Sequence, residues 1–350
     1  MQKIQIAGIE IGDDCKPFIV AELSGNHQQD YALAEKMVEA AADAGVHAIK
    51  LQTYTPETMT LDLQNKDFIV NDENSLWQDE NLYELYGKAS TPWEWHKPLF
   101  DKAKSLGLIA FSSPFDATAV DFLETLDVPC YKIASFENND LPLIKKVAQT
   151  GKPIIISTGM ASQNEIKDLI STICDTGNNQ IILLKCTSNY PADASDSNLA
   201  TIAHMKEKYR YPVGLSDHSD GITVSLAAVA LGACLVEKHF VIDRQAGGID
   251  AEFSLEPDEL RSLVTEAEKI NAALGHIQYG GSDNEQKSKK YRRSIYCSQT
   301  ILKGDVFTAD NIRVIRPGFG LPPKYFESVI GKTAIQDIKA GTAIHWDFIQ

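Results

Sequence analysis

The sequence predicts an α/β protein in which a closed (β/α)₈ barrel precedes a small β-rich domain. Over the first 275 of its 350 residues, eight short runs rich in β-branched residues alternate with helix-like stretches. This alternation is typical of a parallel sheet covered by helices, and eight units in about 250 residues favour a closed barrel over an open sheet. After the barrel region the helical pattern ends and a repeated β-like segment follows.

The predicted strands and helices follow one another at short intervals. We expect strands at residues 18–23, 48–53, 109–113, 130–135, 153–159, 180–188, 212–218 and 233–240. Helix-like stretches rich in Ala, Leu, Glu and Lys come between or after them, for example 31–44, 92–106, 117–126 and 257–274. The connection over residues 54–91 is longer than most such loops, so it predicts an ordered excursion over the barrel rim or a partner contact.

A change of composition after residue 274 predicts the domain boundaries. We expect a barrel domain over residues 1–276, a linker over 277–291 and a β-rich domain over 292–350. Within the last domain, residues 301–312 can be laid over 338–349, which matches Ile301 with Ile338. This match predicts two similar halves, although two copies are too few for a solenoid and could be only a folding unit.

Composition excludes several classes of function. Hydrophobic residues make up 43% of the chain and charged residues 23%, and no apolar run is long enough to cross a bilayer, so no membrane partner is expected. The net charge of −15 opposes binding to nucleic acid and means that an anionic substrate needs a local basic pocket. Six cysteines without a Cys-x-x-Cys pair, and an N-terminus without a signal peptide's apolar segment, favour the reducing cytoplasm.

Two lysines lie near the carboxyl ends of separate predicted strands. These ends share one rim of a barrel, the face where active sites lie. Lys50 and Lys132 would therefore form a binding site for a phosphate and a carboxylate, in a protein too acidic to attract anions globally. One lysine could instead be a Schiff-base nucleophile, as in barrel aldolases. A second cation nearby and a pair of histidines both favour the anion site.

The two histidines, His218 and His239, end neighbouring predicted strands. Adjacent strands lie roughly 5 Å apart, so the two imidazoles could share one divalent cation, with water and substrate oxygens as its other ligands. Mn²⁺, Fe²⁺ or Zn²⁺ would suit such a site, and ligand type alone does not choose among them. A single histidine would more often be a hydrogen-bonded core residue, but the pair favours the metal.

Acidic and amide side chains lie on the same predicted rim. Glu22 and Gln52 end the first two strands, Glu237 lies on the eighth strand and Asp250 follows it. These groups could hold sugar hydroxyls or amides, or transfer protons. Any one of them could also merely cap a loop.

Together these motifs resemble the sialic acid synthase family, in which a TIM barrel is followed by an antifreeze-like (SAF) domain. The matching stretches cover essentially the whole chain and are 19–22 with Asn26 and His27, 50–53, 112–115, 131–133, 157–160, 186–187, 190–191, 215–218, 237–240 and 316–318. Glu-Leu-Ser-Gly-Asn-His at 22–27 and Lys-Leu-Gln-Thr-Tyr-Thr-Pro at 50–56 look like the pseudaminic acid synthases of this family. The alternative is an N-acetylneuraminic or legionaminic acid synthase.

The resemblance implies a transferase that condenses phosphoenolpyruvate with an open-chain amino-sugar aldehyde and water. For the pseudaminic acid branch the sugar is 2,4-diacetamido-2,4,6-trideoxy-β-L-altropyranose, and phosphate leaves by C–O cleavage. The resemblance further implies that His218 and His239 hold Mn²⁺ or a similar ion that activates the aldehyde. A carbohydrate-binding or ice-binding protein is suggested only by the tail, and would not require two lysines and two histidines on the rim.

The resemblance also assigns roles to single residues. The catalytic positions are Glu22, Lys50, Lys132 and Glu237. The positions that bind phosphoenolpyruvate are Lys50, Ser113, Lys132, Ser135, Ser157, Ser188 and Ser216. The positions that face the sugar are Gln52, Tyr190, Asp250 and Arg316. In the family the antifreeze-like domain covers the barrel of a partner subunit, so a domain-swapped homodimer is implied, with Arg316 reaching the partner's site.

Overall fold

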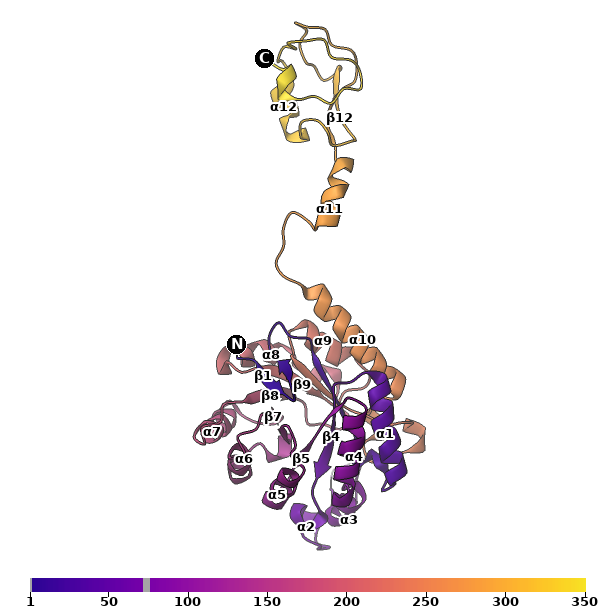
Figure 1. The fold of residues 1–350 in the computed structure, drawn as a ribbon, viewed down its shortest axis with the longest axis vertical. Coiled ribbons are helices and arrows are strands. Elements are labelled where there is room, and N and C mark those ends of the chain that lie inside the picture. Colours follow the sequence, from indigo (N-terminus) through magenta and orange to yellow (C-terminus); the bar gives the residue numbers. More distant parts are fainter. Residues whose placement is uncertain (1, 72–75) are drawn as a thin grey trace. The chain divides into compact units, whose positions relative to one another are not determined.

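The computed structural model of the chain describes residues 2–71 and 76–350 and divides into two compact units, Met1–Gly275 and His276–Gln350 (Figure 1). Within the described residues, eight parallel strands close into a barrel in the order β10-β3-β4-β5-β6-β7-β8-β9. They are β3 (Phe18–Glu22), β4 (Ala48–Thr53), β5 (Ile109–Pro114), β6 (Tyr131–Ile133), β7 (Ile154–Ser157), β8 (Ile181–Cys186), β9 (Val213–Asp217) and β10 (Leu235–His239). The predicted barrel is confirmed: seven of the predicted ranges contain the observed strand, and β5 extends one residue beyond the predicted 109–113.

Helices surround the strands (Figure 1). They are α1 (Tyr31–Ala44), α4 (Trp93–Ser105), α5 (Ala117–Thr125), α6 (Leu141–Ala148), α7 (Gln163–Cys174), α8 (Ala200–Tyr209), α9 (Thr223–Ala230) and α10 (Pro257–Leu274). In α1 the Asp30 side chain accepts hydrogen bonds from the first turn, and Ala34, Met37, Val38 and Ala41 form a fully buried stripe at helical spacing. This buried stripe is what holds the helix against the barrel.

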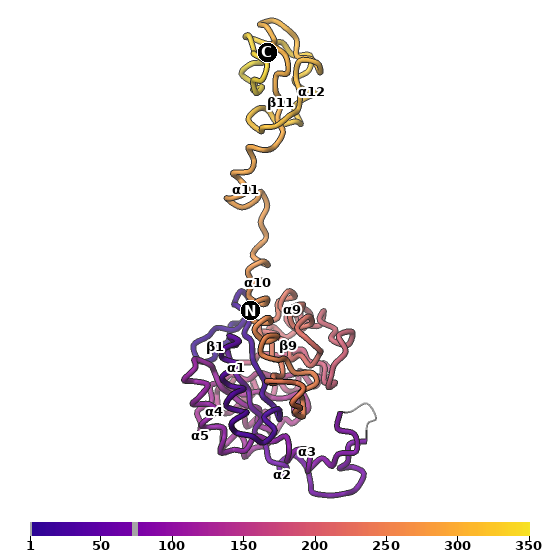
Figure 2. The backbone as a smooth tube through the Cα atoms, turned by 90° about the vertical axis from the view of Figure 1, so that its right-hand side faces the viewer, coloured from indigo at the N-terminus to yellow at the C-terminus, as the bar shows by residue number. Residues whose placement is uncertain are grey.

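An N-terminal hairpin closes one end of the barrel. Its strands, β1 (Ile4–Ile6) and β2 (Ile9–Ile11), pair antiparallel across a turn in which Ala7 and Gly8 both have positive φ. The buried isoleucines of the hairpin share a core cluster with inward-facing residues of the barrel strands, such as Phe111. The hairpin lies at the end of the barrel opposite α2 and α3 (Figure 1 and Figure 2). Sequence reasoning missed this hairpin.

The described part of the predicted excursion, residues 54–71 and 76–91, contains short elements; residues 72–75 lie outside the described residues. The elements are α2 (Pro56–Met59), η2 (Lys66–Phe68) and α3 (Leu82–Ala89). Buried histidines fasten both of its ends: His96 Nε2 lies 2.8 Å from Thr53 Oγ1, and His27 Nε2 lies 3.1 Å from Thr91 Oγ1. The segment therefore leaves and rejoins the barrel at fixed points.

The second unit is built from two halves related by the predicted repeat. Its paired strands are β11 (Ser294–Cys297) and β12 (Ile312–Ile315). The matched residues Ile301 and Ile338 pair with each other, each donating its N–H to the other's carbonyl at 2.9 and 2.7 Å. The halves therefore meet about a pseudo-two-fold axis, as expected of a duplicated module. The predicted linker, 277–291, contains α11 (Asp283–Ser288) and η7 (Lys289–Tyr291).

Candidate active site

A cavity of about 290 Å³ opens at the carboxyl ends of the barrel strands. The barrel brings most of the predicted site residues to its lining: Glu22, Lys50, Gln52, Ser113, Lys132, Ser135, Ser157, Tyr190, Ser216, His218, Glu237, His239 and Asp250. Ser188 is not part of this lining, and its hydroxyl lies 3.7 Å from Cys186 Sγ. Arg316 belongs to the second unit, just after β12.

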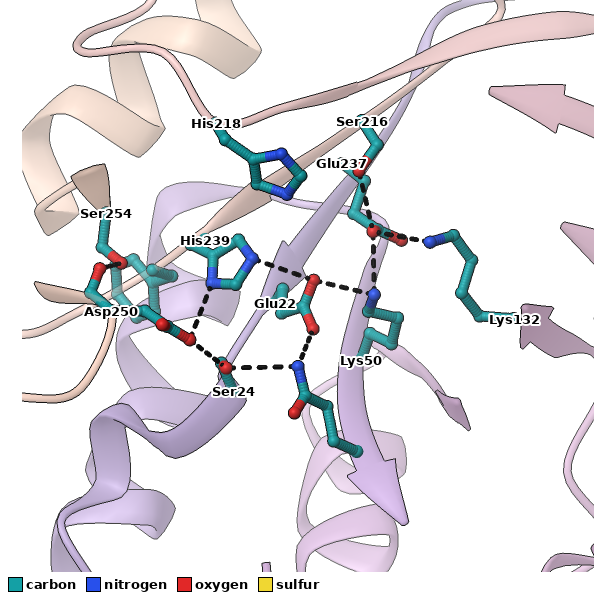
Figure 3. A network of polar contacts seen from close by, with 12 residues as sticks. Glu22, Ser24, Lys50, Lys132, Ser216, His218, Glu237, His239, Asp250 and Ser254 are labelled. Atoms are coloured by element: carbon teal, nitrogen blue, oxygen red, sulfur yellow. Dashed lines mark hydrogen bonds and ion pairs between the residues drawn. The ribbon is translucent and has the colours of Figure 1, made fainter. Parts of the chain in front are cut away.

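The floor of the cavity is a buried cluster of two lysines and two carboxylates (Figure 3). Lys50 Nζ lies 2.7 Å from Glu22 Oε2 and 2.8 Å from Glu237 Oε1. Lys132 Nζ lies 3.1 Å from that same Glu237 oxygen. The four side chains are only 2–3% exposed as residues. Two cations therefore balance two anions in a region where an unpaired charge would be very costly.

The charge state of this cluster follows from competition between burial and neighbouring charges. Burial alone would raise the pKa of Glu22, but Lys50, with help from His239 and Lys132, holds that pKa well below its usual range. Burial would lower the pKa of Lys50, but Glu22 and Glu237 raise it above the usual value. For Lys132 burial prevails and lowers the pKa, although Glu237 opposes the shift. Glu22 and Lys50 are thus firmly ionised at neutral pH.

Several polar atoms beside the lysines are buried without a hydrogen-bond partner in the described residues. They are Ser113 Oγ, Ser157 Oγ and Glu237 Oε2. The hydroxyl of Ser216 lies 3.3 Å from the other oxygen of Glu237, and Ser135 Oγ accepts a hydrogen bond from the Gly159 N–H at 3.2 Å. Buried hydroxyls normally have partners. The hydroxyls of Ser113 and Ser157 are donors next to two ammonium groups and suit an anionic ligand, whereas Glu237 Oε2 is an acceptor.

The rings of His218 and His239 lie side by side, with centroids 5.2 Å apart (Figure 3). His218 Nδ1 is 2.9 Å from the carbonyl oxygen of Thr187. Because a carbonyl can only accept, Nδ1 carries the proton, which leaves the Nε2 lone pair free to act as a ligand. His239 Nε2 lies 3.4 Å from Glu22 Oε2, and its Nδ1 lies 3.4 Å from Asp250 Oδ2 without a hydrogen bond.

The donor chemistry at the histidines fits a divalent cation. Two imidazoles with the carboxylate of Glu22 beside them are ligands that first-row transition metals accept. The buried Nδ1 of His239, which has no hydrogen-bond partner among the residues that the structure describes, fits a donor set that would hold such an ion. No group of three or more His, Cys, Asp or Glu side chains in the described residues has the arrangement of a complete metal site. Water and substrate oxygens would have to supply the remaining ligands.

A second buried ion pair braces the strands that carry the histidines. Lys238 Nζ lies 3.2 Å from Asp217 Oδ2, and Ser225 of α9 donates to the same oxygen at 2.5 Å. Asp217 and Lys238 are register partners on β9 and β10. Because successive residues of a strand point to opposite faces, this pair faces the helices while its neighbours His218 and His239 face the cavity. The pair therefore helps to set the separation of the two histidines.

Sequence reasoning missed several ionisable residues that line the cavity, among them Glu137 and Cys186. Glu137, in η3 (Ser135–Glu137), is partly buried, and burial raises its pKa to about 7. Burial by itself would raise the pKa of Cys186, but the neighbouring His218 lowers it to about 6. The only sequence signal for Glu137 was its position two residues after Ser135. Its environment depends on tertiary contacts that the sequence alone does not reveal.

Comparisons with known proteins agree with this geometry. The chain is 43% identical over 331 residues to a pseudaminic acid synthase from Campylobacter jejuni subsp. jejuni serotype O:2, covering 95% of this chain and 96% of that protein. It is 38% identical over 332 residues to an N,N'-diacetyllegionaminic acid synthase from the same organism, covering 93% and 97%. Both alignments therefore include the barrel and the second unit.

A solved structure and family models complete the comparison. The crystal structure of an N-acetylneuraminic acid synthetase from Leptospira borgpetersenii, in complex with citrate, matches with a TM-score of 0.74 and 36% identity, covering 82% of this chain and 95% of that one. The SAF domain matches residues 292–350 and the NeuB family matches residues 37–279. The chain therefore belongs to the NeuB family, with a SAF domain after its barrel.

Proposed function

We propose that this chain is a pseudaminic acid synthase. It condenses phosphoenolpyruvate with the open-chain form of 2,4-diacetamido-2,4,6-trideoxy-β-L-altropyranose and water, and releases pseudaminic acid and phosphate. The observation that carries the proposal is 43% identity over nearly the full length of a pseudaminic acid synthase. The cavity supports it, because it combines two buried lysines with a pair of histidines. N-acetylneuraminic and legionaminic acid synthesis remain the alternatives, and the legionaminic relative is less similar.

The lysine cluster is the binding site that we propose for phosphoenolpyruvate. Lys50 and Lys132 would exchange part of their contact with Glu237 for the phosphate and carboxylate of the substrate. Ser113 and Ser157, whose hydroxyls have no hydrogen-bond partner within residues 2–71 and 76–350, would donate to these anions, and Ser135 and Ser216 would add further polar contacts. Ser188 lies beyond the lining, so its direct contact with the substrate would require a shift of the loop after β8.

We propose that His218 and His239 hold the divalent metal, Mn²⁺ being the first choice. When bound, such an ion would supply Lewis-acid polarisation of the sugar aldehyde. Chelation with EDTA should abolish phosphate release, and added Mn²⁺ should restore it. Replacement of either histidine by alanine should also lower Mn²⁺ affinity, measured by titration calorimetry, at least tenfold. Undiminished activity after complete chelation would refute the metal assignment.

In the proposed reaction, C3 of phosphoenolpyruvate attacks the aldehyde carbon and a C–C bond forms. The aldehyde oxygen takes up a proton and water adds at C2 with loss of one proton. The C2 hydroxyl so formed passes its remaining proton to the leaving group as the bond from C2 to the phosphate oxygen breaks, which releases hydrogen phosphate and leaves a ketone. Glu22 and Glu237 are ionised carboxylates at the cluster, and because the lysines lower their pKa values they would act there mainly as fixed negative charges and only as weak proton acceptors. Glu137, with a pKa of about 7, can donate or accept a proton near neutral pH.

Gln52, Tyr190 and Asp250 are the sugar-facing residues that we propose within the barrel. Arg316 would reach the sugar from the SAF domain of a partner in a domain-swapped homodimer. This arrangement predicts complementation, because a mixed dimer of Arg316→Ala and Lys132→Met chains contains one site with both wild-type residues. Mixing the two inactive variants under subunit-exchange conditions should restore activity, and no recovery despite confirmed exchange would refute the swap.

The described residues contain no helix that is both long and apolar enough to span a membrane. We infer a cytoplasmic location, which the absence of disulfides among the six free cysteines supports.

The decisive experiment for the function is a sugar screen. The metal-loaded protein is incubated with phosphoenolpyruvate and, separately, the altrose derivative, N-acetylmannosamine and the sugar precursor of legionaminic acid, and phosphate is measured. Phosphate release should be fastest with the altrose derivative and absent without sugar. If phosphate is released with N-acetylmannosamine but not with the altrose derivative, pseudaminic acid is not the product. Borohydride trapping of a covalent adduct would favour a Schiff-base aldolase instead.

A further inference from the structure

One wall of the cavity is apolar and comes from the described parts of a single segment, residues 54–71 and 76–91. Its lining members are Tyr54, Met59, Val70, Trp77, Leu82, Leu85, Tyr86 and Ala89. The floor, in contrast, carries the lysines, carboxylates and serines from the ends of the barrel strands. The cavity therefore offers ionic contacts at its base and a largely apolar surface on the side formed by this segment.

Trp77 extends the apolar wall across the open end of the barrel, where it contacts loops that follow other strands. The segment follows β4, whereas Tyr190 follows β8, and these two strands stand on opposite sides of the eight-strand barrel. The rings of Trp77 and Tyr190 nevertheless meet, with centroids 6.1 Å apart. Trp77 Nε1 also donates a hydrogen bond to the carbonyl of Ile249, after β10, at 3.3 Å. Three loops thus converge on one indole ring.

The same contacts place Trp77 relative to the reacting end of the sugar. Tyr190 packs against His218 with ring centroids 4.4 Å apart, so Trp77 lies one aromatic ring beyond the histidine pair. In the proposed function the aldehyde carbon lies at the histidines and the phosphoenolpyruvate anions at the lysines. From there the apolar wall is within reach of the remainder of the sugar.

We propose that Trp77 and the apolar wall around it select sugars in which C6 is a methyl group and acetamido groups stand in place of hydroxyls. The inference rests on the proposed function and concerns how the same site chooses its sugar. A C6 methyl and the acetamido methyls would be buried against Trp77, Val70 and Leu82. N-acetylmannosamine would bring hydroxyls to the same surface, where an apolar wall provides few partners. Differences of this kind give preferences of roughly 10- to 200-fold.

The test compares kcat/KM for the altrose derivative and for N-acetylmannosamine by phosphate release. Trp77→Ala should lower kcat/KM for the altrose derivative at least tenfold, mainly through KM, and reduce the ratio between the two sugars by a similar factor. Trp77→Phe should keep most of the ratio, and the KM for phosphoenolpyruvate should stay within about twofold. Leu61→Ala is the matched control, because Leu61 belongs to the same segment but is 60% exposed and outside the lining.

A second, milder variant tests the same inference even if Trp77→Ala does not fold. Val70→Thr is nearly isosteric and adds one hydroxyl to the wall, so the ratio should shift several-fold toward N-acetylmannosamine. Equal losses for both sugars in Trp77→Ala, with an unchanged ratio in Val70→Thr, would overturn the inference, because they indicate a structural role without selection. Wild-type protein that releases no phosphate with either sugar would instead overturn the proposed function.

Discussion

Replacing Lys50 by methionine tests the electrostatic account of the buried cluster most directly. The substitution removes the cation that lies 2.7 Å from Glu22 and 2.8 Å from Glu237, and leaves Lys132 as the nearby ammonium group of the cluster. Breaking a buried ion pair by removing one partner costs about 3–5 kcal/mol. We expect a loss of stability of this size at pH 8.

The loss of stability in Lys50→Met should depend on pH, because the substitution changes the pKa values of the neighbouring carboxyl groups. In the wild type, the low pKa of Glu22 means that its contribution to stability is complete above the unfolded pKa of 4.5 and is lost only at lower pH. Without Lys50, burial raises the carboxyl pKa values, so the folded variant binds a proton that the unfolded chain does not bind between pH 5 and 8. The loss of stability should therefore shrink as the pH falls from 8 to 5, by about 1.4 kcal/mol for each unit of pKa shift.

Urea unfolding followed by circular dichroism at pH 5, 6.5 and 8 measures this difference. Subtracting the wild-type free energy at each pH removes the contribution of groups that the substitution does not touch. Adding Glu22→Gln to Lys50→Met should flatten the dependence. Lys97→Met, at an exposed i,i+4 ion pair, should change stability by less than about 1 kcal/mol at every pH. A loss for Lys50→Met that is equal at all three pH values, or larger at pH 5, would refute the reasoning.

Three further predictions concern single residues elsewhere in the barrel. Burial raises the pKa of Glu137 to about 7, so this group lowers the stability of the fold as the pH rises from 4.5 through 7. Glu137→Gln should therefore stabilise the protein at pH 8 by up to about 3 kcal/mol in urea unfolding, and destabilisation at that pH would contradict this. Burial lowers the pKa of His96 to about 4, so the free energy of unfolding of the wild type should fall as the pH drops from 6.5 to 4. His96→Asn should make this decrease smaller by up to about 3 kcal/mol, whereas an unchanged pH profile would argue against the shift. A Cβ at Gly214 would lie 2.3 Å from the Leu235 carbonyl oxygen, so Gly214→Ala should lower thermal stability by more than about 3 kcal/mol, whereas Gly87→Ala, on α3 with its nearest contact at 3.7 Å, should be neutral or stabilising. Similar melting temperatures for these two alanine variants would contradict the packing argument.

The barrel could be predicted from sequence because its strands are buried on both faces. A strand such as Ile181–Cys186 appears as a continuous apolar run, and the polar residues that end each run point to one rim. The N-terminal hairpin was not predicted because its strands have three residues each, too few to show an alternation of hydrophobic and polar residues. Its closing role follows from contacts with strands far away in the chain.

The candidate site was predictable in its residue types and less so in its pairings. Lys50, Lys132, His218 and His239 were recognised because charged groups at strand ends are informative in a barrel. That Glu237 would pair with both lysines through one oxygen depends on geometry across the barrel. Trp77 gave no signal, because it lies in the middle of a long connection and reaches the cavity only through tertiary contacts.

The Asp217–Lys238 pair also fixes the register of β10 against β9. If β10 slipped by one residue against β9, Lys238 would turn into the cavity and lose Asp217, while His239 would turn toward the helices. The slipped form would contain a buried, uncompensated carboxylate on the outer face, which is a penalty of several kcal/mol before any packing is lost. The alternation of charge and imidazole along the two strands thus disfavours a one-residue register slip, which would separate the two histidines.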